Sequence, residues 1–213
     1  MLTVFEIYES IQGESTHAGR PCVFVRLAAC DLRCAWCDTP YAFTGGTKKP
    51  VEDVVREVEG FGARMVEITG GEPMLQREVT VLMQKLLDAG HEVLLETGGH
   101  IPLDDVPEAV VAIVDVKCPG SGESARMHWP NLEQLSPHDE VKFVIADRVD
   151  FEYACEVVRR YDLTARAAAV LYSPVHGALS AAELAGWILA ARLPVRLQLQ
   201  QHKYIWDPTA RGV

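Results

Sequence analysis

The chain has 213 residues, of which 48% are hydrophobic and 23% charged, and its formal net charge is −10. This length and composition are typical of one soluble globular domain with a sizeable core. The negative charge disfavours binding along a nucleic-acid backbone and favours a small-molecule ligand. The sequence contains no run of about 18 apolar residues, so no membrane span is predicted. The start, "MLTVFEIYES", does not resemble a signal peptide. We therefore expect a cytoplasmic protein without nucleic-acid or membrane partners, in which thiols stay reduced.

Apolar, β-branched runs alternate with amphipathic helical patterns along the chain. In chain order, strands are expected at 23–28, 65–69, 92–97, 111–117, 140–145, 167–172 and 195–200. Helices are expected at 51–61, 75–90, 148–161 and 180–193. Ser180, three residues before Glu183, predicts an N-cap, and Gly90 predicts a C-cap. The stretch 98–140 is less regular, with weak helix signals at 104–110 and 131–135.

This alternation predicts an α/β fold in one domain, 1–213, with a parallel sheet covered by helices. Six or seven such units could form a full barrel, a partial barrel or an open doubly wound sheet, and periodicity does not separate these. The unusual residues follow the strands, for example "CDLRCAWC", "GGEP" and "SPVHG". Ligands of parallel α/β folds bind at the carboxyl ends of the strands, so we expect one site there.

Three of the six cysteines, Cys30, Cys34 and Cys37, fall within "CDLRCAWCD". A structural zinc site would need four ligands, usually as two pairs, and Cys118 and Cys155 are isolated. Three thiolates can instead bind three irons of a [4Fe–4S] cubane, which normally has four cysteine ligands. The fourth iron would then be open to a substrate or cofactor.

The Cys-x3-Cys-x2-Cys spacing, with Trp36 before the last cysteine, resembles the cluster loop of the radical S-adenosylmethionine enzymes. In that family the loop follows the first strand of a partial (β/α)6 barrel, and "ITGGEP" (68–73) resembles the segment along the methionine end of S-adenosylmethionine. The segments "IYESIQGES" (7–15), "LLETGGH" (94–100), "DVKCPGSGES" (115–124) and "LQLQQHKYIW" (197–206) narrow the resemblance. Over essentially the whole chain they resemble the 7-carboxy-7-deazaguanine synthase family of queuosine and 7-deazapurine biosynthesis.

The resemblance implies a reaction. S-adenosylmethionine would bind the open iron, and an electron from a partner such as flavodoxin would cleave it to a 5′-deoxyadenosyl radical. That radical would take a hydrogen from C6 of 6-carboxy-5,6,7,8-tetrahydropterin. The substrate radical would contract its ring and lose ammonia to give 7-carboxy-7-deazaguanine. The family also implies a homodimer.

The resemblance implies the site residues as well, and it assigns no catalytic side chain because the radical comes from the cofactor. Cys30, Cys34 and Cys37 would hold the [4Fe–4S] cluster, and Thr39 would bind Mg²⁺ together with the substrate. The S-adenosylmethionine site would comprise Trp36, Gly71, Glu72, Asp115, Val116, Lys117, Ser173, Pro174, Val175 and His176. The substrate site would comprise Ile11, Gln12, Gly13, Glu14, Arg26, Thr69, His202 and Pro208, with residues 200–213 closing the pocket.

Some alternatives stay open at this point. Arg26 lies in an apolar strand and needs an anionic partner, which could be the substrate carboxylate or an acidic neighbour in the protein. His202 could pack or be solvated instead of binding substrate. Two other functions compete with the synthase: a glycyl-radical activating enzyme, which acts on a protein, and a non-catalytic iron–sulfur or zinc module.

Overall fold

One nine-stranded sheet runs through the computed structural model, which describes residues 1–213. Its strand order is β3-β1-β2-β4-β5-β6-β7-β8-β9. The parallel strands are β2 (Pro21–Leu27), β4 (Met65–Gly70), β5 (Glu92–Thr97), β6 (Val111–Asp115), β7 (Glu140–Ile145), β8 (Ala169–Pro174) and β9 (Arg196–Leu197). Two antiparallel strands, β1 (Leu2–Ile11) and β3 (Thr47–Lys49), extend the sheet beyond β2.

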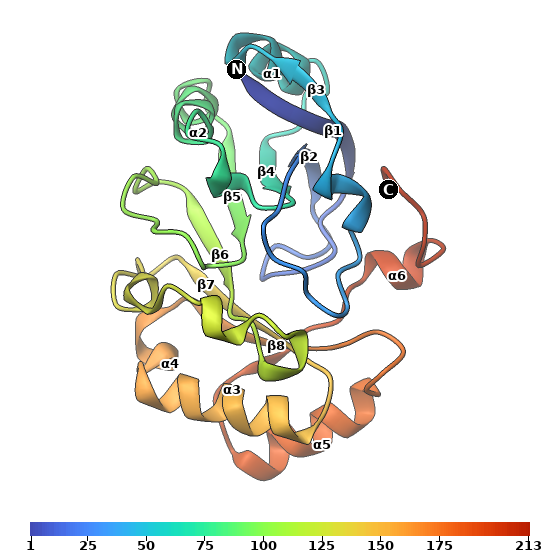
Figure 1. Ribbon diagram of the computed structural model, residues 1–213, viewed down its shortest axis with the longest axis vertical. Coiled ribbons are helices and arrows are strands. Elements are labelled where there is room, and N and C mark those ends of the chain that lie inside the picture. The colour runs from blue at the N-terminus through green and yellow to red at the C-terminus, as the bar shows by residue number, and fades with distance from the viewer.

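The parallel strands follow one another in chain order, without the reversal that a doubly wound sheet requires. Right-handed crossovers then place the helices on one side of the sheet. Figure 1 shows the sheet curving into an open ring with the helices outside it. These helices are α1 (Val51–Glu59), α2 (Val79–Asp88), α3 (Arg148–Arg160), α4 (Leu163–Arg166) and α5 (Ala181–Ala191). The sheet does not close on itself, so the fold is the expected partial barrel.

Most of the expected elements are confirmed. All seven predicted strands form, although the last is only two residues long. The four predicted helices form within a few residues of their expected limits. The Ser180 hydroxyl accepts a hydrogen bond from the Glu183 N–H at 3.1 Å, and Gly90 has a φ of +88° after α2. β1 was not predicted, because its half-exposed face makes apolar and polar residues alternate, whereas the buried parallel strands are marked by continuous apolar runs.

Two crossovers contain no α-helix, so the helix signals between 98 and 140 are wrong. Residues 104–110 form turns, and the second signal corresponds to a single 3-10 turn, Trp129–Leu132. Pro107 lies inside the first stretch, where proline removes the N–H donor that a continuing helix needs, and Pro137 follows directly after the second stretch and its neighbour Ser136. None of the helices in the structure has both the length and the apolar character that crossing a bilayer requires.

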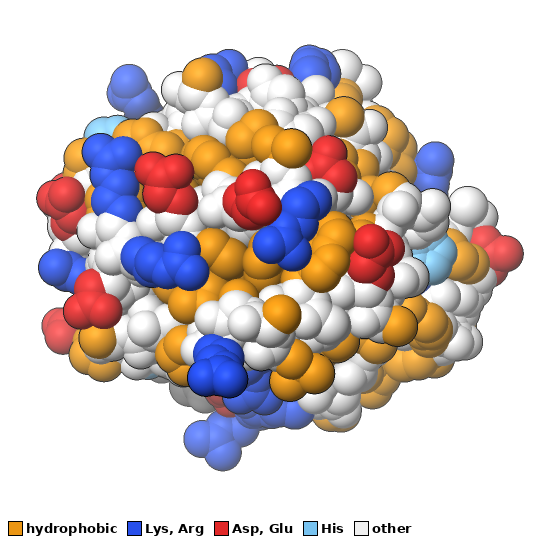
Figure 2. All heavy atoms as spheres, turned by 90° about the horizontal axis from the view of Figure 1, so that it is seen from below, with side chains coloured by type: hydrophobic (Ala, Val, Ile, Leu, Met, Phe, Trp, Pro, Cys, Tyr) orange, Lys and Arg blue, Asp and Glu red, His pale blue; other side chains and the backbone are white.

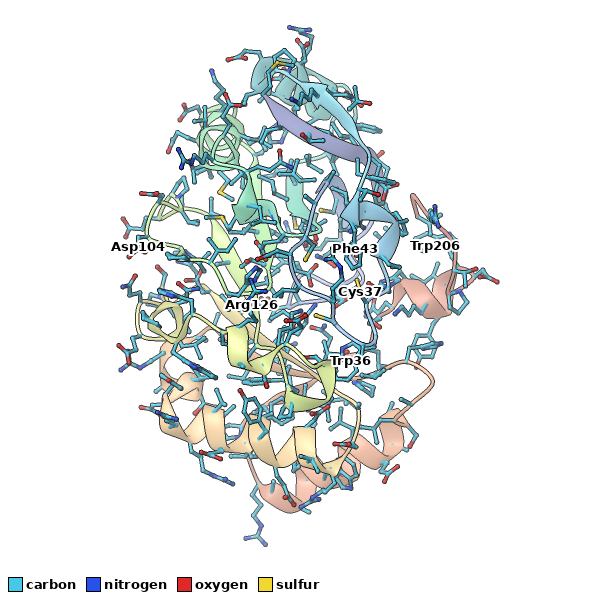
Figure 3. The ribbon with its side chains drawn as sticks, viewed as in Figure 1. Trp36, Cys37, Phe43, Asp104, Arg126 and Trp206 are labelled. Carbon is cyan, nitrogen blue, oxygen red and sulfur yellow. The ribbon has the colours of Figure 1, made fainter.

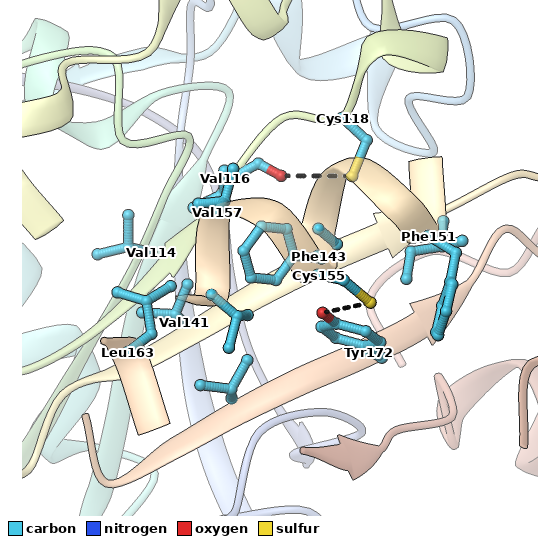
Figure 4. Close-up of a cluster of buried hydrophobic side chains, with 14 of the residues drawn as sticks. Val114, Val116, Cys118, Val141, Phe143, Phe151, Cys155, Val157, Leu163 and Tyr172 are labelled. Atoms are coloured by element: carbon cyan, nitrogen blue, oxygen red, sulfur yellow. Dashed lines mark hydrogen bonds between the residues drawn. The ribbon is translucent and has the colours of Figure 1, made fainter. Parts of the chain in front are cut away.

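The outer face of the sheet packs against the helices in two apolar clusters. Figure 4 shows part of one, where Phe143 and Tyr172 meet edge to face with ring centroids 5.5 Å apart. The Tyr172 hydroxyl donates to Sγ of Cys155 at 3.8 Å, and Cys118 is buried in the same cluster. These two cysteines therefore belong to the core.

The inner face of the sheet changes character along the strands. Near their amino ends, a small apolar cluster contains Phe24, Met65, Leu94 and Ile113. Side chains of a strand return to the same face every second residue. Two positions farther along, the same four strands carry Arg26, Glu67, Glu96 and Asp115. The carboxyl end of the barrel interior is therefore polar and charged.

Candidate active site

The cluster loop, residues 28–39, leaves β2 and crosses the open ring of strands. Figure 3 labels Trp36 and Cys37 on this loop, near the centre of the view. Hydrogen bonds hold the loop within its surroundings: Cys37 N–H donates to the Cys34 carbonyl at 3.2 Å, and Ala35 N–H donates to the Ser121 carbonyl at 3.0 Å. Asp31 anchors the first turn through His100 Nε2, at 2.7 Å, and through the guanidinium of Arg126.

The three thiols of this loop fit a cubane better than a single metal ion. Cys30, Cys34 and Cys37 are free and half-buried. No group of three or more His, Cys, Asp or Glu side chains in the structure surrounds a point where one metal ion could sit. A zinc site needs such convergence, whereas in a [4Fe–4S] cluster each thiolate binds a different iron. Cys118 is packed in the apolar cluster on the outer face of the sheet, so it does not provide a fourth ligand.

The two glycines of "GGEP" lie against the cluster loop and the end of β2. The Glu72 N–H donates to the Ala29 carbonyl at 2.8 Å. A Cβ at Gly71 would lie 1.9 Å from that carbonyl oxygen, and one at Gly70 would lie 2.5 Å from the Leu27 carbonyl oxygen. Glycine is therefore required at both positions by contacts within the chain itself.

The carboxylate of Glu72 is committed to the neighbouring loop. Oε1 accepts from the Thr97 hydroxyl at 2.8 Å, and Oε2 accepts from the Gly98 N–H at 2.8 Å. Glu72 thus joins the loop after β4 to the end of β5.

A network of charges fills the polar end of the barrel. Lys142 Nζ lies 2.9 Å from Oε2 of Glu14 and 3.7 Å from Oδ2 of Asp115, and it also contacts Oε1 of Glu96. Lys117 Nζ lies 2.8 Å from the same Asp115 oxygen. Burial alone would lower the pKa of Lys142, but the carboxylates of Glu14 and Glu96 raise it well above its usual range. Lys142 is therefore a buried cation.

The predicted substrate residues at the start of the chain lie on a loop inside the barrel. The amide of Gln12 donates to Oε2 of the buried Glu67. Glu14 accepts from Nε2 of Gln198 at 3.0 Å and from Nε2 of Gln200 at 2.9 Å. Ile11, immediately before this loop, is the last residue of β1 and half-buried.

The C-terminal segment closes the open side of the barrel next to this loop (Figure 1). It contains the short helix α6 (His202–Ile205). Gln201 N–H donates to the Gly13 carbonyl at 2.9 Å, and a Cβ at Gly13 would lie 2.6 Å from Nδ1 of His202. Lys203 Nζ lies 3.0 Å from Oδ2 of Asp38, the residue after the last cluster cysteine. The segment is thus tied to both the substrate loop and the cluster loop.

Arg26 has acidic and polar partners within the protein. Its Nε donates to Oε1 of Glu6 at 2.8 Å, one NH2 hydrogen goes to the Tyr8 hydroxyl at 3.0 Å, and one NH1 hydrogen goes to the Gly70 carbonyl at 3.2 Å. A guanidinium has five N–H donors, so two remain. Thr69, its register partner on β4, is buried, and its hydroxyl donates to Oε2 of Glu96 at 3.4 Å.

Seven of the ten predicted S-adenosylmethionine residues, 115–117 and 173–176, lie at the carboxyl ends of β6 and β8. Ser173, Pro174 and Val175 are buried, and His176 is exposed. A groove of about 580 Å³ is lined by Pro174 and His176 on one side and by Leu199, Gln200 and Tyr204 on the other. Asp115 Oδ1 and Ser173 Oγ are buried without hydrogen-bond partners, so both are available to a ligand.

Four predicted residues remain: Thr39 and Trp36 on the cluster loop, Val116 after β6 and Pro208 in the C-terminal tail. Thr39 Oγ1 lies 3.8 Å from Cys37 Sγ and 3.5 Å from the Gly70 carbonyl oxygen. Val116 is buried, with its N–H bonded to the Lys142 carbonyl at 2.8 Å. Trp36 packs over Gly120.

Pro208 is exposed in the tail after α6. The tail turns back toward the loop, since the Arg211 guanidinium lies 4.1 Å from the centre of the Tyr41 ring.

Sequence reasoning missed Glu67, Glu96, Lys142, Gln198 and Gln200. Each lies inside a stretch that was interpreted as an apolar strand. For Glu67, Glu96 and Lys142 the available signal was the one that singled out Arg26: a charged residue inside an apolar strand must face a partner. Gln198 and Gln200 are uncharged, so this signal does not find them.

Comparisons with known proteins agree with this geometry. The model of the radical SAM superfamily matches residues 25–162. The 7-carboxy-7-deazaguanine synthase of Koribacter versatilis is 47% identical over 226 residues, covering 100% of both chains. The enzyme of the same name from Chlorobaculum tepidum is 44% identical and covers 100% of this chain and 97% of its own.

Among solved structures, the fold resembles that of QueE from Escherichia coli, with a TM-score of 0.78, 24% sequence identity and 94% of each chain covered. With two full-length relatives above 40% identity, the chain belongs to the 7-carboxy-7-deazaguanine synthase family of the radical SAM superfamily.

Proposed function

We propose that this chain converts 6-carboxy-5,6,7,8-tetrahydropterin into 7-carboxy-7-deazaguanine, contracting the ring with loss of ammonia, for queuosine or 7-deazapurine biosynthesis. The observation that carries the proposal is the charged barrel interior, in which Gln12, Glu14, Arg26 and Thr69 converge from three segments next to a three-cysteine loop. An apolar or purely structural interior would not need these groups.

Members of this family use a [4Fe–4S] cluster and S-adenosylmethionine, and the donor set fits both groups. Cys30, Cys34 and Cys37 would hold the cluster, and the buried, unpartnered oxygens of Asp115 and Ser173 would face the cofactor. The N–H and the carboxylate of Glu72 and the carbonyl of Gly70 already have partners, so a contact from "GGEP" would come from the backbone of Gly71. When bound, the two groups supply the radical that starts the reaction.

The chain's own residues bind and orient the substrate in this proposal. Glu14 is an acceptor, suited to the N–H groups of an aminopyrimidinone edge, and Gln12 offers both a donor and an acceptor. The two remaining N–H groups of Arg26 would bind the substrate carboxylate. His202 and the tail with Pro208 would close the pocket from the C-terminal side. Thr39, next to the Gly70 carbonyl, would supply one oxygen ligand to Mg²⁺, with substrate and water supplying the others.

The partners follow from the same chemistry. The substrate is a small molecule, and a reductant must deliver an electron to the cluster. We propose flavodoxin as this donor. We also propose the reducing cytoplasm as the compartment, because thiols stay reduced there and remain available for iron. The single continuous sheet supports one domain over 1–213.

A homodimer is part of the proposal as well. Figure 2 views the molecule from the side of α3 and α5 and shows apolar side chains between charged ones. On these helices Val149 is 63% exposed and Leu189 is 77% exposed, which supports a contact with a second copy. Sedimentation of the protein at micromolar concentration should give twice the mass of one chain, and the mass of one chain would contradict the dimer.

The experiment that tests the reaction starts from anaerobically reconstituted protein. Incubation with dithionite, S-adenosylmethionine and the pterin should give 7-carboxy-7-deazaguanine, detected by mass spectrometry. Cofactor cleavage without deazapurine would refute the substrate but keep the radical chemistry, and would favour a glycyl-radical activating enzyme. One zinc and no iron per chain would refute both enzyme functions.

Arg26→Ala provides a test at the substrate site. Loss of the guanidinium should weaken pterin binding by about tenfold or more, as expected for a charged hydrogen bond. The cluster absorbance should remain, because Arg26 contacts Glu6, Tyr8 and the Gly70 carbonyl and none of the cysteines. Arg20→Ala is the matched control, since Arg20 is exposed and pairs with Glu92. Loss of the cluster in Arg26→Ala would show that Arg26 is structural.

A further inference from the structure

Lys142 occupies a central place in the polar end of the barrel. It is the third residue of β7, and its side chain is only 5% exposed. Its ammonium group faces three carboxylates, those of Glu14, Glu96 and Asp115, from three other segments of the chain. An ammonium has three N–H donors, so one donor is available for each carboxylate.

The acids near Lys142 outnumber the other cations in the barrel interior. Glu14, Glu67, Glu96 and Asp115 face it from the loop after β1, from β4, from β5 and from β6, and Asp38 adds a more distant negative charge. Lys117 pairs with Asp115 alone, and Arg26 pairs with Glu6. Lys142 is therefore the only cation that forms an ion pair with Glu14 or Glu96.

We propose that Lys142 is a positioning residue: by gathering Glu14, Glu96 and Asp115 around one buried ammonium group, it fixes Glu14 as the acceptor for the substrate. The proposal rests on the proposed function, in which Glu14 binds the pterin. It also connects the substrate side of the barrel to Asp115, on the cofactor side.

The charge state of Glu14 supports this role. Burial by itself would raise the pKa of Glu14, but Lys142, with help from Gln200, keeps it below the usual range. Burial and the carboxylates of Glu96 and Glu14 raise the pKa of Glu67 well above its usual range, so the interior already holds one acid that resists ionisation. Removing Lys142 would leave Glu14 beside other acids in a region of low dielectric, and Glu14 would take up a proton. A protonated Glu14 is no longer an acceptor on both oxygens.

The test compares Lys142→Met with Lys142→Met/Glu96→Gln, which also removes one of the acids. Pterin binding is measured by anaerobic equilibrium dialysis between pH 6.5 and 9, and cluster iron and substrate-free cleavage of S-adenosylmethionine are measured on the same samples. In Lys142→Met, affinity should fall about tenfold or more at neutral pH, as for loss of a charged hydrogen bond. It should recover as the pH rises and Glu14 ionises again. The double variant should regain part of the affinity at neutral pH. Cluster iron should stay within about twofold of wild type, because Lys142 pairs with Glu14, Glu96 and Asp115 and with none of the three cysteines.

The outcomes separate the possibilities. Wild-type affinity and a wild-type pH profile in Lys142→Met would overturn the proposal. If Lys142→Met does not fold, the double variant decides: a shifted pH profile supports the proposal, and an unshifted one overturns it. Equal loss of affinity at every pH would show a merely structural role and would also overturn it. Failure of the proposed function looks different, since wild-type protein would then cleave S-adenosylmethionine without binding the pterin. Lys85→Met, on the exposed face of α2, is the matched control.

Discussion

Gly71 lies where "GGEP" crosses the cluster loop, and its missing side chain is what allows the two segments to touch. The Ala29 carbonyl would lie 1.9 Å from a Cβ at this position, far inside van der Waals contact. The same carbonyl accepts the Glu72 N–H, so it cannot move away without losing that bond. The glycine therefore positions the cluster loop as well as leaving room for a cofactor.

Gly71→Ala should lower the free energy of unfolding by about 1–3 kcal/mol, the usual cost of overpacking. It should also displace Cys30 and reduce the iron bound on reconstitution. Gly186→Ala is the matched control: Gly186 lies within α5, and a Cβ there would have no atom within 4 Å, so alanine should stabilise the helix by about 0.5–1 kcal/mol. Urea unfolding and iron analysis would measure both effects. Full iron loading in Gly71→Ala would contradict the role assigned to this contact.

At the scale of elements, the C-terminal segment 198–206 completes the barrel. The two edge strands, β3 and β9, do not pair with each other. This segment fills the gap between β9 and the loop that follows β1. Ser15 N–H donates to Oε1 of Gln198 at 2.8 Å, and the Lys203 ammonium donates to Oε1 of Gln200 at 2.7 Å and pairs with Asp38. One short segment thus holds together the substrate loop and the cluster loop.

Lys203→Met should loosen this segment. We expect faster amide hydrogen exchange in residues 198–213 and weaker pterin binding, with exchange in the core of the sheet unchanged, because the lost contacts are local. Hydrogen exchange followed by mass spectrometry would measure this. Lys49→Met removes a more exposed ion pair, with Glu57, and serves as the control. Unchanged exchange in 198–213 would mean that the backbone contacts of Gln201 hold the segment without Lys203.

At the scale of the whole molecule, the fold separates an apolar outer layer, which provides the stability, from a charged inner layer at one end of the barrel. Two kinds of buried acid in that inner layer make opposite contributions to the stability of the folded state as the pH changes. Glu14 and Asp115 have pKa values lowered by Lys142 and Lys117 against the effect of burial, so their stabilisation is present at neutral pH and lost as the pH falls. Glu67 has a raised pKa, so its contribution favours the folded state at low pH and is lost as the pH rises.

Glu67→Gln should therefore stabilise the protein increasingly above pH 5. The unfolded chain releases the Glu67 proton near its usual pKa of about 4.3, whereas the folded chain retains it, and each pH unit in this window costs up to about 1.4 kcal/mol. The amide keeps an acceptor for Gln12. Unfolding free energies at pH 5 and pH 8 would measure the difference between variant and wild type. Glu152→Gln, in an exposed pair with Arg148, should show no such trend. A constant difference across this range would mean that Glu67 is ionised in the folded protein.

Local patterns in the sequence were enough for much of the fold. Apolar runs and helical periods are set by neighbouring residues, so the parallel strands and the four main helices could be predicted. The cluster loop could be recognised because its three cysteines lie within one short segment. The antiparallel β1 was missed because its alternating pattern is weak evidence on its own. The helix signal near 104–110 was wrong because Pro107 interrupts it, and the signal at 131–135 was wrong because the stretch between Pro130 and Pro137 forms only one 3-10 turn.

Tertiary structure decided what faces what inside the barrel. Lys142 meets Glu14 from 128 residues away and Glu96 from 46 residues away, and no local pattern specifies such pairs. From the sequence, the substrate carboxylate could have been the only partner of Arg26. Strand pairing also places Glu6 and Tyr8 within hydrogen-bond distance of it. The sequence by itself determined the class of fold and the chemistry of the cysteine loop, because both depend on residues close together in the chain. The charge network and the closure of the barrel depend on register and long-range contacts, which exist only once the sheet has formed.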